Sequence, residues 1–219
     1  MENTEIAEVK QETEVSTCNA FANTEAFNNL YKMGKMLASS DLVPVAYHNK
    51  PTDCAIAIDM ANRMNVSPMF VMQNLYVVKG KPSWSGQACM SMINASPLFK
   101  EVKPVYTGEK NTDTWGCYVQ AIRTSDGETV KGAEVSIKMA KDEGWYGKPG
   151  SKWQTMPELM LAYRAAAFFA RVHIPNSLMG CSVEGEVEDM QKQELPTPPN
   201  PLSNKHDEKI MKEAEEVFG

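Results

Sequence analysis

The spacing of apolar residues changes twice along this chain, and that change constrains the fold more than any other feature. Between residues 27 and 36, apolar side chains recur every three or four positions, as in an amphipathic helix. From residue 75 to residue 137, apart from a helical stretch at 85–94, they fall in short runs separated by glycine, proline and polar residues, which is typical of strands. Helical spacing returns after residue 156. The sequence therefore predicts an α+β fold.

The expected elements form a small antiparallel sheet with a β-hairpin, packed against several helices. Helices are expected over about residues 24–36, 52–64, 67–72, 85–94, 155–172 and 206–218, and a short helix or a turn over 138–143. Strands are expected over about residues 75–79, 99–106, 114–123 and 128–137. Gly80-Lys81-Pro82 is expected to end the first strand, because proline cannot donate to a strand ladder.

Two local motifs fix parts of this pattern. Ser125-Asp126-Gly127 predicts a hairpin between the last two strands, since glycine supplies the positive φ of a tight turn. Thr155-Met156-Pro157-Glu158 has the form of a capping box, which predicts that the longest helix begins at Thr155.

Charge and composition divide the chain into three parts. Residues 1–20 are acidic without an apolar period and are expected to be disordered. Residues 21–190 are expected to form one domain. Residues 191–219 are expected to form a proline-rich linker, at 194–205, and a short acidic helix.

Several classes of protein are disfavoured. No run approaches the roughly 20 apolar residues of a membrane helix, and residues 1–15 lack the apolar core of a secretory signal. The five cysteines are scattered, with no Cys-x-x-Cys pair, which argues against a disulfide framework or a zinc site. We therefore expect reduced thiols, a cytoplasmic location and no membrane association.

No catalytic or cofactor motif is recognisable. Gly80-Lys81 is followed by proline, so no phosphate-binding loop and no use of ATP are inferred. The three histidines, at 48, 173 and 206, lie far apart in the sequence, and no metal site is predicted. We expect no enzymatic activity and no cofactor, and an unrecognised enzyme remains an alternative.

The distribution of charge is compatible with a polyanionic ligand. Residues 20–183 contain 17 basic and 13 acidic side chains, for a net charge of +4. Residues 1–19 carry −4 and residues 184–219 carry −6, which accounts for the overall −6. A basic body of this size could bind nucleic acid, but an ordinary solvated surface would have the same charge.

Basic and aromatic residues are interleaved at several positions, as single-strand binding requires, because phosphates bind cations and unstacked bases stack on rings. The loop at 145–153 combines both types, and Arg164 and Arg171 lie seven residues apart on the longest helix. The tryptophans could instead fill a core edge, and the arginines could pair with carboxylates. The predicted DNA-binding residues are Lys79, Lys81, Trp84, Arg123, Trp145, Lys148, Lys152, Trp153, Arg164 and Arg171.

Segments between residues 64 and 189, more than half of the chain, resemble the RecT family of phage and prophage recombinases. Two of them are Gly150-Ser151-Lys152-Trp153 and Leu178-Met179-Gly180. The full set of matching segments is 66–69, 73–85, 143–146, 150–153, 155–161, 163–169 and 178–180.

This resemblance implies a protein that anneals complementary single DNA strands without ATP, in rings or helical filaments. It implies a hairpin and a small sheet on helices that line a basic groove, with residues 76–81 near the nucleic acid. Lys152, Trp153 and Arg164 match the region where the family's basic helix begins. In many members that helix is rich in lysine, whereas here Arg164 and Arg171 are its only lysines or arginines.

The same resemblance implies partners. These are single-stranded DNA, the annealed duplex, further copies of the chain, and a phage exonuclease or host single-strand-binding protein, which the C-terminal helix would contact. Six methionines between residues 33 and 72 could serve subunit contacts as well as a core. The alternative from another class is a phage scaffold or partner-binding protein without nucleic-acid activity.

Overall fold

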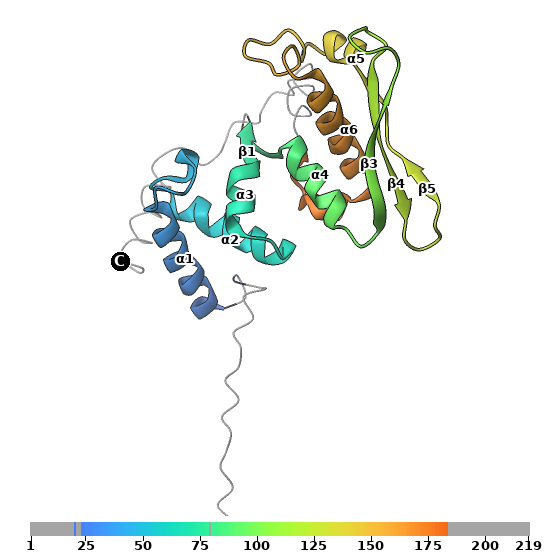
Figure 1. Ribbon diagram of the computed structural model, residues 1–219. Helices are drawn as coiled ribbons and strands as arrows, with labels where there is room; N and C mark the ends of the chain where they lie inside the picture. Colours follow the sequence, from blue (N-terminus) through green and yellow to red (C-terminus); the bar gives the residue numbers. More distant parts are fainter. Residues whose placement is uncertain (1–19, 21–22, 79, 184–219) are drawn as a thin grey trace, which may run out of the picture. The chain divides into compact units, whose positions relative to one another are not determined.

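A computed structural model describes residues 20, 23–78 and 80–183 of the chain (Figure 1). Residues 1–187 form one unit by their internal contacts and residues 188–219 another, so all described residues belong to the first unit. The predicted disordered N-terminus, proline-rich linker and terminal helix lie outside the described residues, and so does Lys79.

The described residues form a mixed α+β unit with two small sheets, which confirms the predicted fold class. Six α-helices are present, each too short or too polar to cross a membrane. The helices are α1 (Thr24–Ala38), α2 (Pro51–Met64), α3 (Pro68–Asn74), α4 (Gly86–Ala95), α5 (Ile137–Asp142) and α6 (Pro157–His173), with 3₁₀ turns η2 (Val45–Tyr47) and η3 (Pro175–Leu178). The strands are β1 (Leu75–Val78), β2 (Lys81–Trp84), β3 (Phe99–Thr107), β4 (Gly116–Arg123), β5 (Thr129–Lys131), β6 (Val135–Ser136) and β7 (Ser182–Val183).

Side-chain caps start several helices where the sequence places a short polar residue. Asn23 accepts a hydrogen bond from the backbone nitrogen of Ala26 at 2.7 Å, and Ser85 accepts one from Ala88 at 3.0 Å. The capping box at Thr155 is a wrong prediction. The N-cap of α6 is Met156, and no side chain caps this helix. Thr155 lies instead in the preceding turn, where its backbone nitrogen donates to the carbonyl oxygen of Lys152.

The first sheet has the order β1-β2-β7. As predicted, the first strand ends before Gly80, which has a φ of 78°. Lys81 and Pro82, however, begin a second strand, β2, which was not predicted and which pairs with β1. Strand β7 then runs parallel to β2, with Ser83 opposite Ser182. This sheet is therefore mixed rather than purely antiparallel.

The second sheet is antiparallel, with the order β3-β4-β5, and β6 also pairs with β4. The predicted hairpin between β4 and β5 is confirmed, with Gly127 at φ of 75°. The predicted strand 128–137 is broken into β5 and β6. Gly132 lies in the break, where a Cβ atom would come within 3.0 Å of the Phe169 ring.

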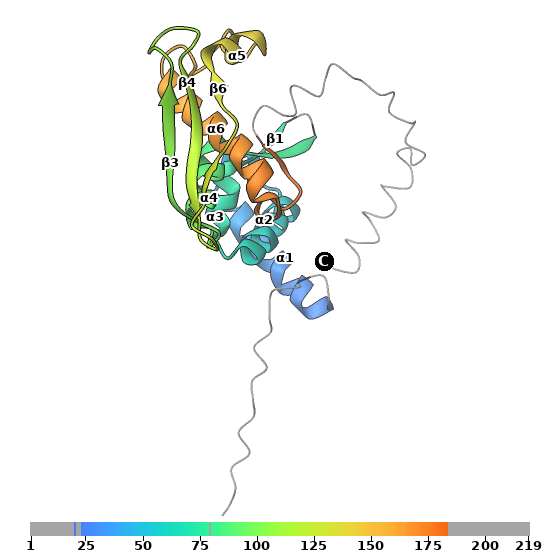
Figure 2. The same cartoon turned by 90° about the vertical axis from the view of Figure 1, so that its right-hand side faces the viewer.

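Helices α4 and α6 pack together and lie on one face of the second sheet (Figures 1 and 2). The core there is aromatic: the Phe99 ring on β3 meets the Phe169 ring on α6 edge to face, with centroids 5.3 Å apart. Cys117 of β4 lies on the sheet face that α6 covers and is fully buried, and this burial raises the pKa of its thiol to about 11.

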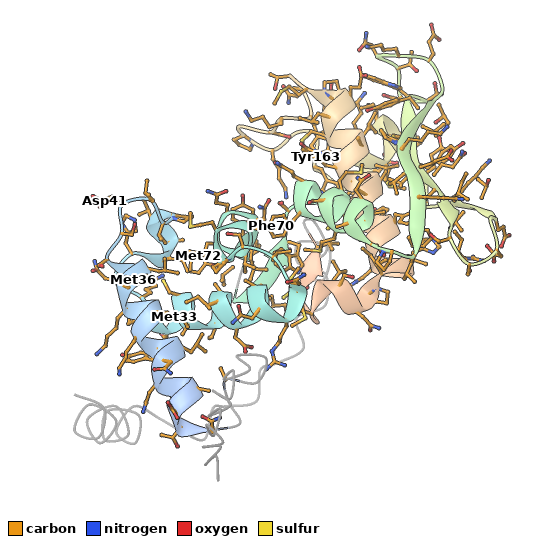
Figure 3. All side chains as sticks on the ribbon, turned by 60° about the horizontal axis from the view of Figure 1, so that its bottom comes forward. Met33, Met36, Asp41, Phe70, Met72 and Tyr163 are labelled. Atoms are coloured by element: carbon orange, nitrogen blue, oxygen red, sulfur yellow. The ribbon has the colours of Figure 1, made fainter. Side chains whose placement is uncertain are left out.

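The N-terminal helices differ in how they use their methionines (Figure 3). Met72 on α3 is buried, whereas Met33 and Met36 on α1 are exposed, Met36 by 65%. Gly34, on the other side of α1, lets that helix approach α2 so closely that a Cβ atom would lie 2.5 Å from the Pro51 carbonyl oxygen. The α1 methionines are thus left outside the described core.

Candidate nucleic-acid interface

The predicted cation-and-ring loop folds into a buried aromatic cluster before α6. The rings of Trp145 and Trp153 lie 6.0 Å apart between centroids, and the two residues are 3% and 2% exposed. The Ser151 hydroxyl closes the loop by donating to the Trp145 carbonyl oxygen at 2.9 Å. Neither ring has a free face on which a base could stack. The prediction that Trp145 and Trp153 bind DNA is therefore wrong for this conformation. The alternative, that these rings fill a core edge, is the one that the structure supports.

Arg164 belongs to the same cluster. It projects from α6 over the face of the Trp145 ring, with the guanidinium carbon 4.0 Å from the ring centroid, and it is only 6% exposed. Phe168, one turn further along α6, meets the Trp145 ring edge to face. The predicted contact of Arg164 with DNA phosphate is corrected for this conformation, because its side chain lies inside the fold.

Replacing Arg164 by lysine is expected to destabilise the fold by about 2 kcal/mol, since an ammonium group lacks the flat surface that stacks on Trp145 in this desolvated position. The free energy of unfolding in urea measures the effect. Arg171→Lys is the matched control on the same helix, because Arg171 is exposed. Equal, small effects of the two substitutions would contradict the structural role of Arg164.

Trp84 is also buried. It is fully inaccessible at the end of β2, and its Nε1 donates to the carbonyl oxygen of Leu178 at 3.0 Å. Phe70 of α3 packs against its ring, with centroids 6.3 Å apart. The prediction that Trp84 contacts DNA is therefore corrected, and the residue instead joins β2 to the segment that follows α6.

The two remaining predicted arginines have protein partners. Arg123 pairs with Asp126 at 2.8 Å and with Glu128 at 2.9 Å in the β4–β5 turn, and its hydrogen bond to Asp126 is the main cause of its raised pKa. Arg171 is exposed and donates to the Cys181 carbonyl oxygen at 3.1 Å. The charge of Arg123 is therefore compensated by two neighbouring carboxylates.

Three predicted lysines keep exposed side chains. Lys81 lies in the β1–β2 hairpin, where the neighbouring Tyr76 and Val77 are 54% and 74% exposed. Lys148 and Lys152 lie in the loop that covers the tryptophan cluster. The predicted DNA-binding residues therefore fall into two groups. The three tryptophans and Arg164 are buried, whereas these three lysines are exposed.

Three further lysines, at 100, 103 and 131, are exposed and were not among the predicted binding residues. They lie on the face of the second sheet turned away from α4 and α6, in rows fixed by the strand register with Gln120 and Ile122 of β4. The sequence signal for this face is the period-two alternation of Cys117, Val119 and Ala121 with the residues between them.

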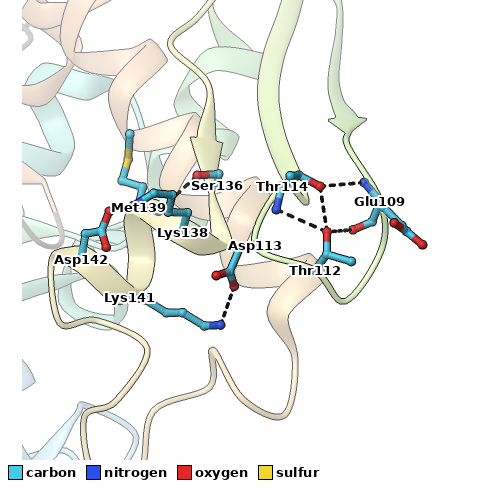
Figure 4. A network of polar contacts seen from close by, with 9 residues as sticks. All are labelled: Glu109, Thr112, Asp113, Thr114, Ser136, Lys138, Met139, Lys141 and Asp142. Atoms are coloured by element: carbon cyan, nitrogen blue, oxygen red, sulfur yellow. Dashed lines mark hydrogen bonds and ion pairs between the residues drawn. The ribbon is translucent and has the colours of Figure 1, made fainter.

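The end of this sheet is tied to α5 by polar contacts (Figure 4). Lys141 of α5 pairs with Asp113 of the β3–β4 loop, and Lys138 pairs with Asp142 at 2.7 Å. Thr112 closes the loop by donating to the Glu109 carbonyl oxygen. These cations are neutralised in pairs, so the network holds the loop in place.

The described residues contain no group of three or more histidine, cysteine, aspartate or glutamate side chains that could hold a metal ion. His173, at the end of α6, packs on the Phe169 ring with centroids 4.3 Å apart, and burial lowers its pKa.

Comparison with known proteins gave no relatives. No protein-family model, no curated protein and no solved structure matches this chain.

Proposed function

We propose that this chain is an ATP-independent single-strand annealing protein of the RecT type. The observation that carries the proposal is that the RecT-like segments, scattered over more than half of the sequence, pack against one another. Trp84 hydrogen-bonds to Leu178, and Trp145 packs against Trp153 and Arg164. Gly86, the residue that follows one of these segments, lies against Tyr163 of another, where a Cβ atom would come 2.6 Å from the Tyr163 Cβ atom. The segments that resemble the RecT family thus form one packed unit.

The finer fold assignment belongs to the same proposal. The β1–β2 hairpin, the small antiparallel sheet and the helices α4 and α6 correspond to the parts that the RecT resemblance implies. In this proposal Trp84, Trp145, Trp153 and Arg164 maintain the scaffold. Lys81, Lys148 and Lys152, with Lys79 outside the described residues, contact phosphates, because their exposed ammonium groups release counterions on binding.

Assembly into a ring or filament is also proposed, because coating a strand requires contacts between neighbouring subunits. Apolar side chains exposed around α1 and α2 suit such contacts: Met36 is 65%, Leu42 85%, Val45 81% and Ile56 53% exposed. The proposed exonuclease or single-strand-binding partner would use the C-terminal helix, outside the described residues. We place the activity in the cytoplasm, of the host cell if a phage encodes the chain.

The deciding experiment measures pairing of two complementary labelled oligonucleotides without nucleotide. The protein is expected to accelerate pairing, and the logarithm of its affinity for one strand should fall linearly with the logarithm of salt concentration. Folded protein that gives no acceleration at low salt would refute the annealing function. A scaffold or partner-binding protein, the alternative, would bind neither oligonucleotide under these conditions.

A further inference from the structure

The antiparallel sheet has two faces of different character. Cys117, Val119 and Ala121 of β4 point toward α4 and α6 and are fully buried. Tyr118, Gln120 and Ile122 alternate with them, point the other way and are partly exposed. No described helix packs on that second side (Figures 1 and 2). We call this side, carrying Tyr118, Gln120, Ile122, Lys100, Lys103 and Lys131, the open sheet face.

A β-bulge places two of the lysines on this face. Lys100 is opposite Ile122 and Lys103 is opposite Gln120, and the register shifts between them. Residues an odd number apart on a regular strand point to opposite faces, so Lys100 and Lys103 would be separated without the extra residue. The bulge contains Glu101 at φ of 54°, a conformation that costs a residue other than glycine energy and tends to be kept at functional positions.

The register aligns these cations across the sheet. Lys103 and Lys131 both lie opposite Gln120, on its two sides, so their Cα atoms are about 10 Å apart, two strand spacings. Next to this row Tyr118 lies opposite Val105, and the Lys131 ammonium group sits 5.5 Å from the Tyr118 ring centroid. A partly exposed ring and aliphatic side chains thus lie between flanking cations.

The lysines of this face differ from other exposed lysines in their ion pairing. Lys100, Lys103 and Lys131 pair with no carboxylate among the residues that the structure describes, whereas Lys110, Lys138 and Lys141 do. Closely spaced cations without counter-ions repel one another, and binding of an anion along the row relieves that repulsion. The apolar side chains between them match the flat faces of unstacked bases.

We propose that the open sheet face binds single-stranded nucleic acid, with Lys100, Lys103 and Lys131 on phosphates and Tyr118 under a base. This inference rests on the proposed function and adds a second binding surface to the one proposed at the β1–β2 hairpin and the 145–153 loop. The four proposed contact residues come from the adjacent strands β3, β4 and β5. The bound nucleic acid therefore runs across the sheet rather than along one β-strand.

The test compares two triple variants of equal charge. K100Q/K103Q/K131Q removes the proposed phosphate contacts, and K32Q/K35Q/K50Q removes three exposed lysines from α1 and the residue before α2. The first is expected to lower the salt slope of oligonucleotide binding by about 2, since each phosphate contact on a single strand contributes about 0.7. Its affinity at low salt should fall about tenfold or more, and the control should keep most of the wild-type slope.

Two further measurements locate the strand. Tyr118→Leu is expected to weaken binding about fivefold or more with little change in salt slope, because stacking is not ionic. A photocrosslinker attached at Gln120→Cys should label a bound oligonucleotide, whereas one at Asn29→Cys, an exposed position on α1, should not.

The outcomes separate this inference from the proposed function. If the wild-type protein fails to bind or pair oligonucleotides, the annealing proposal itself is refuted. If it pairs them normally and the two triple variants bind alike, with no crosslink at position 120, only the open sheet face is refuted. Loss of binding to anionic lipid vesicles, with oligonucleotide binding unchanged, would assign the face to a membrane surface and also overturn the inference.

Discussion

Replacing Trp84 by alanine is expected to lower the free energy of unfolding by about 3–5 kcal/mol, because it empties a site filled by a large ring. Trp84 is 0% exposed and contacts Phe70, and its indole nitrogen satisfies the Leu178 carbonyl oxygen. The substitution leaves a cavity and also an unpaired buried acceptor. Urea unfolding followed by circular dichroism measures the loss.

Two companion variants sharpen this test. Trp84→Phe keeps most of the ring and removes only the hydrogen bond, so it should lose clearly less stability than the alanine variant. Tyr76→Ala truncates an aromatic residue of the same hairpin that is 54% exposed, and it should change stability little. If Trp84→Ala remained as stable as Tyr76→Ala, Trp84 would not be a core residue and a role at the surface would have to be reconsidered.

Replacing Gly86 by alanine is expected to cost about 2–3 kcal/mol, at the upper end of what overpacking a core costs. The new methyl group would lie 2.6 Å from the Cβ atom of Tyr163 and 2.8 Å from its carbonyl oxygen. Because those atoms belong to or adjoin the backbone of α6, they cannot rotate away, and α4 must shift from α6. The sign of the change in stability is informative, because alanine at an unhindered helical position would stabilise a helix relative to glycine.

Gly147→Ala is the matched control, because nothing lies within 4 Å of a Cβ atom at that position and its φ needs no glycine. The midpoint of thermal unfolding should fall for Gly86→Ala and stay nearly unchanged for Gly147→Ala. Equal midpoints would mean that α4 and α6 are not in close contact, which would also weaken the packing argument for the proposed family.

Local signals in the sequence predicted most helices and strands of the described region. Asn23 and Ser85 cap helices because their short side chains reach backbone nitrogens within one turn, an interaction that sequence alone can specify. Gly127 likewise allows the turn between β4 and β5, because glycine readily adopts the positive φ found there. The errors arose where tertiary contacts decide: β7 is two residues long and exists only because β2 lies beside it.

The candidate site was harder to predict because composition does not reveal burial. Trp145, Trp153 and Arg164 would look the same in a sequence whether they stack on bases or on one another, and here they stack on one another. Lys100 and Lys103 escaped notice for a related reason. They lie on the same face of the sheet only because of the bulge at Glu101. That bulge breaks the alternation of two residues from which the faces of a strand are predicted.

The burial of every tryptophan affects how this protein can be studied. The chain has four, and Trp84, Trp115, Trp145 and Trp153 are all less than 5% exposed. Their intrinsic fluorescence therefore arises from the interior, shielded from aqueous quenchers, and it changes when the core opens. A ligand on the surface would leave that emission largely unaltered, so a flat fluorescence titration would not be evidence against binding. A label on the oligonucleotide would report binding directly.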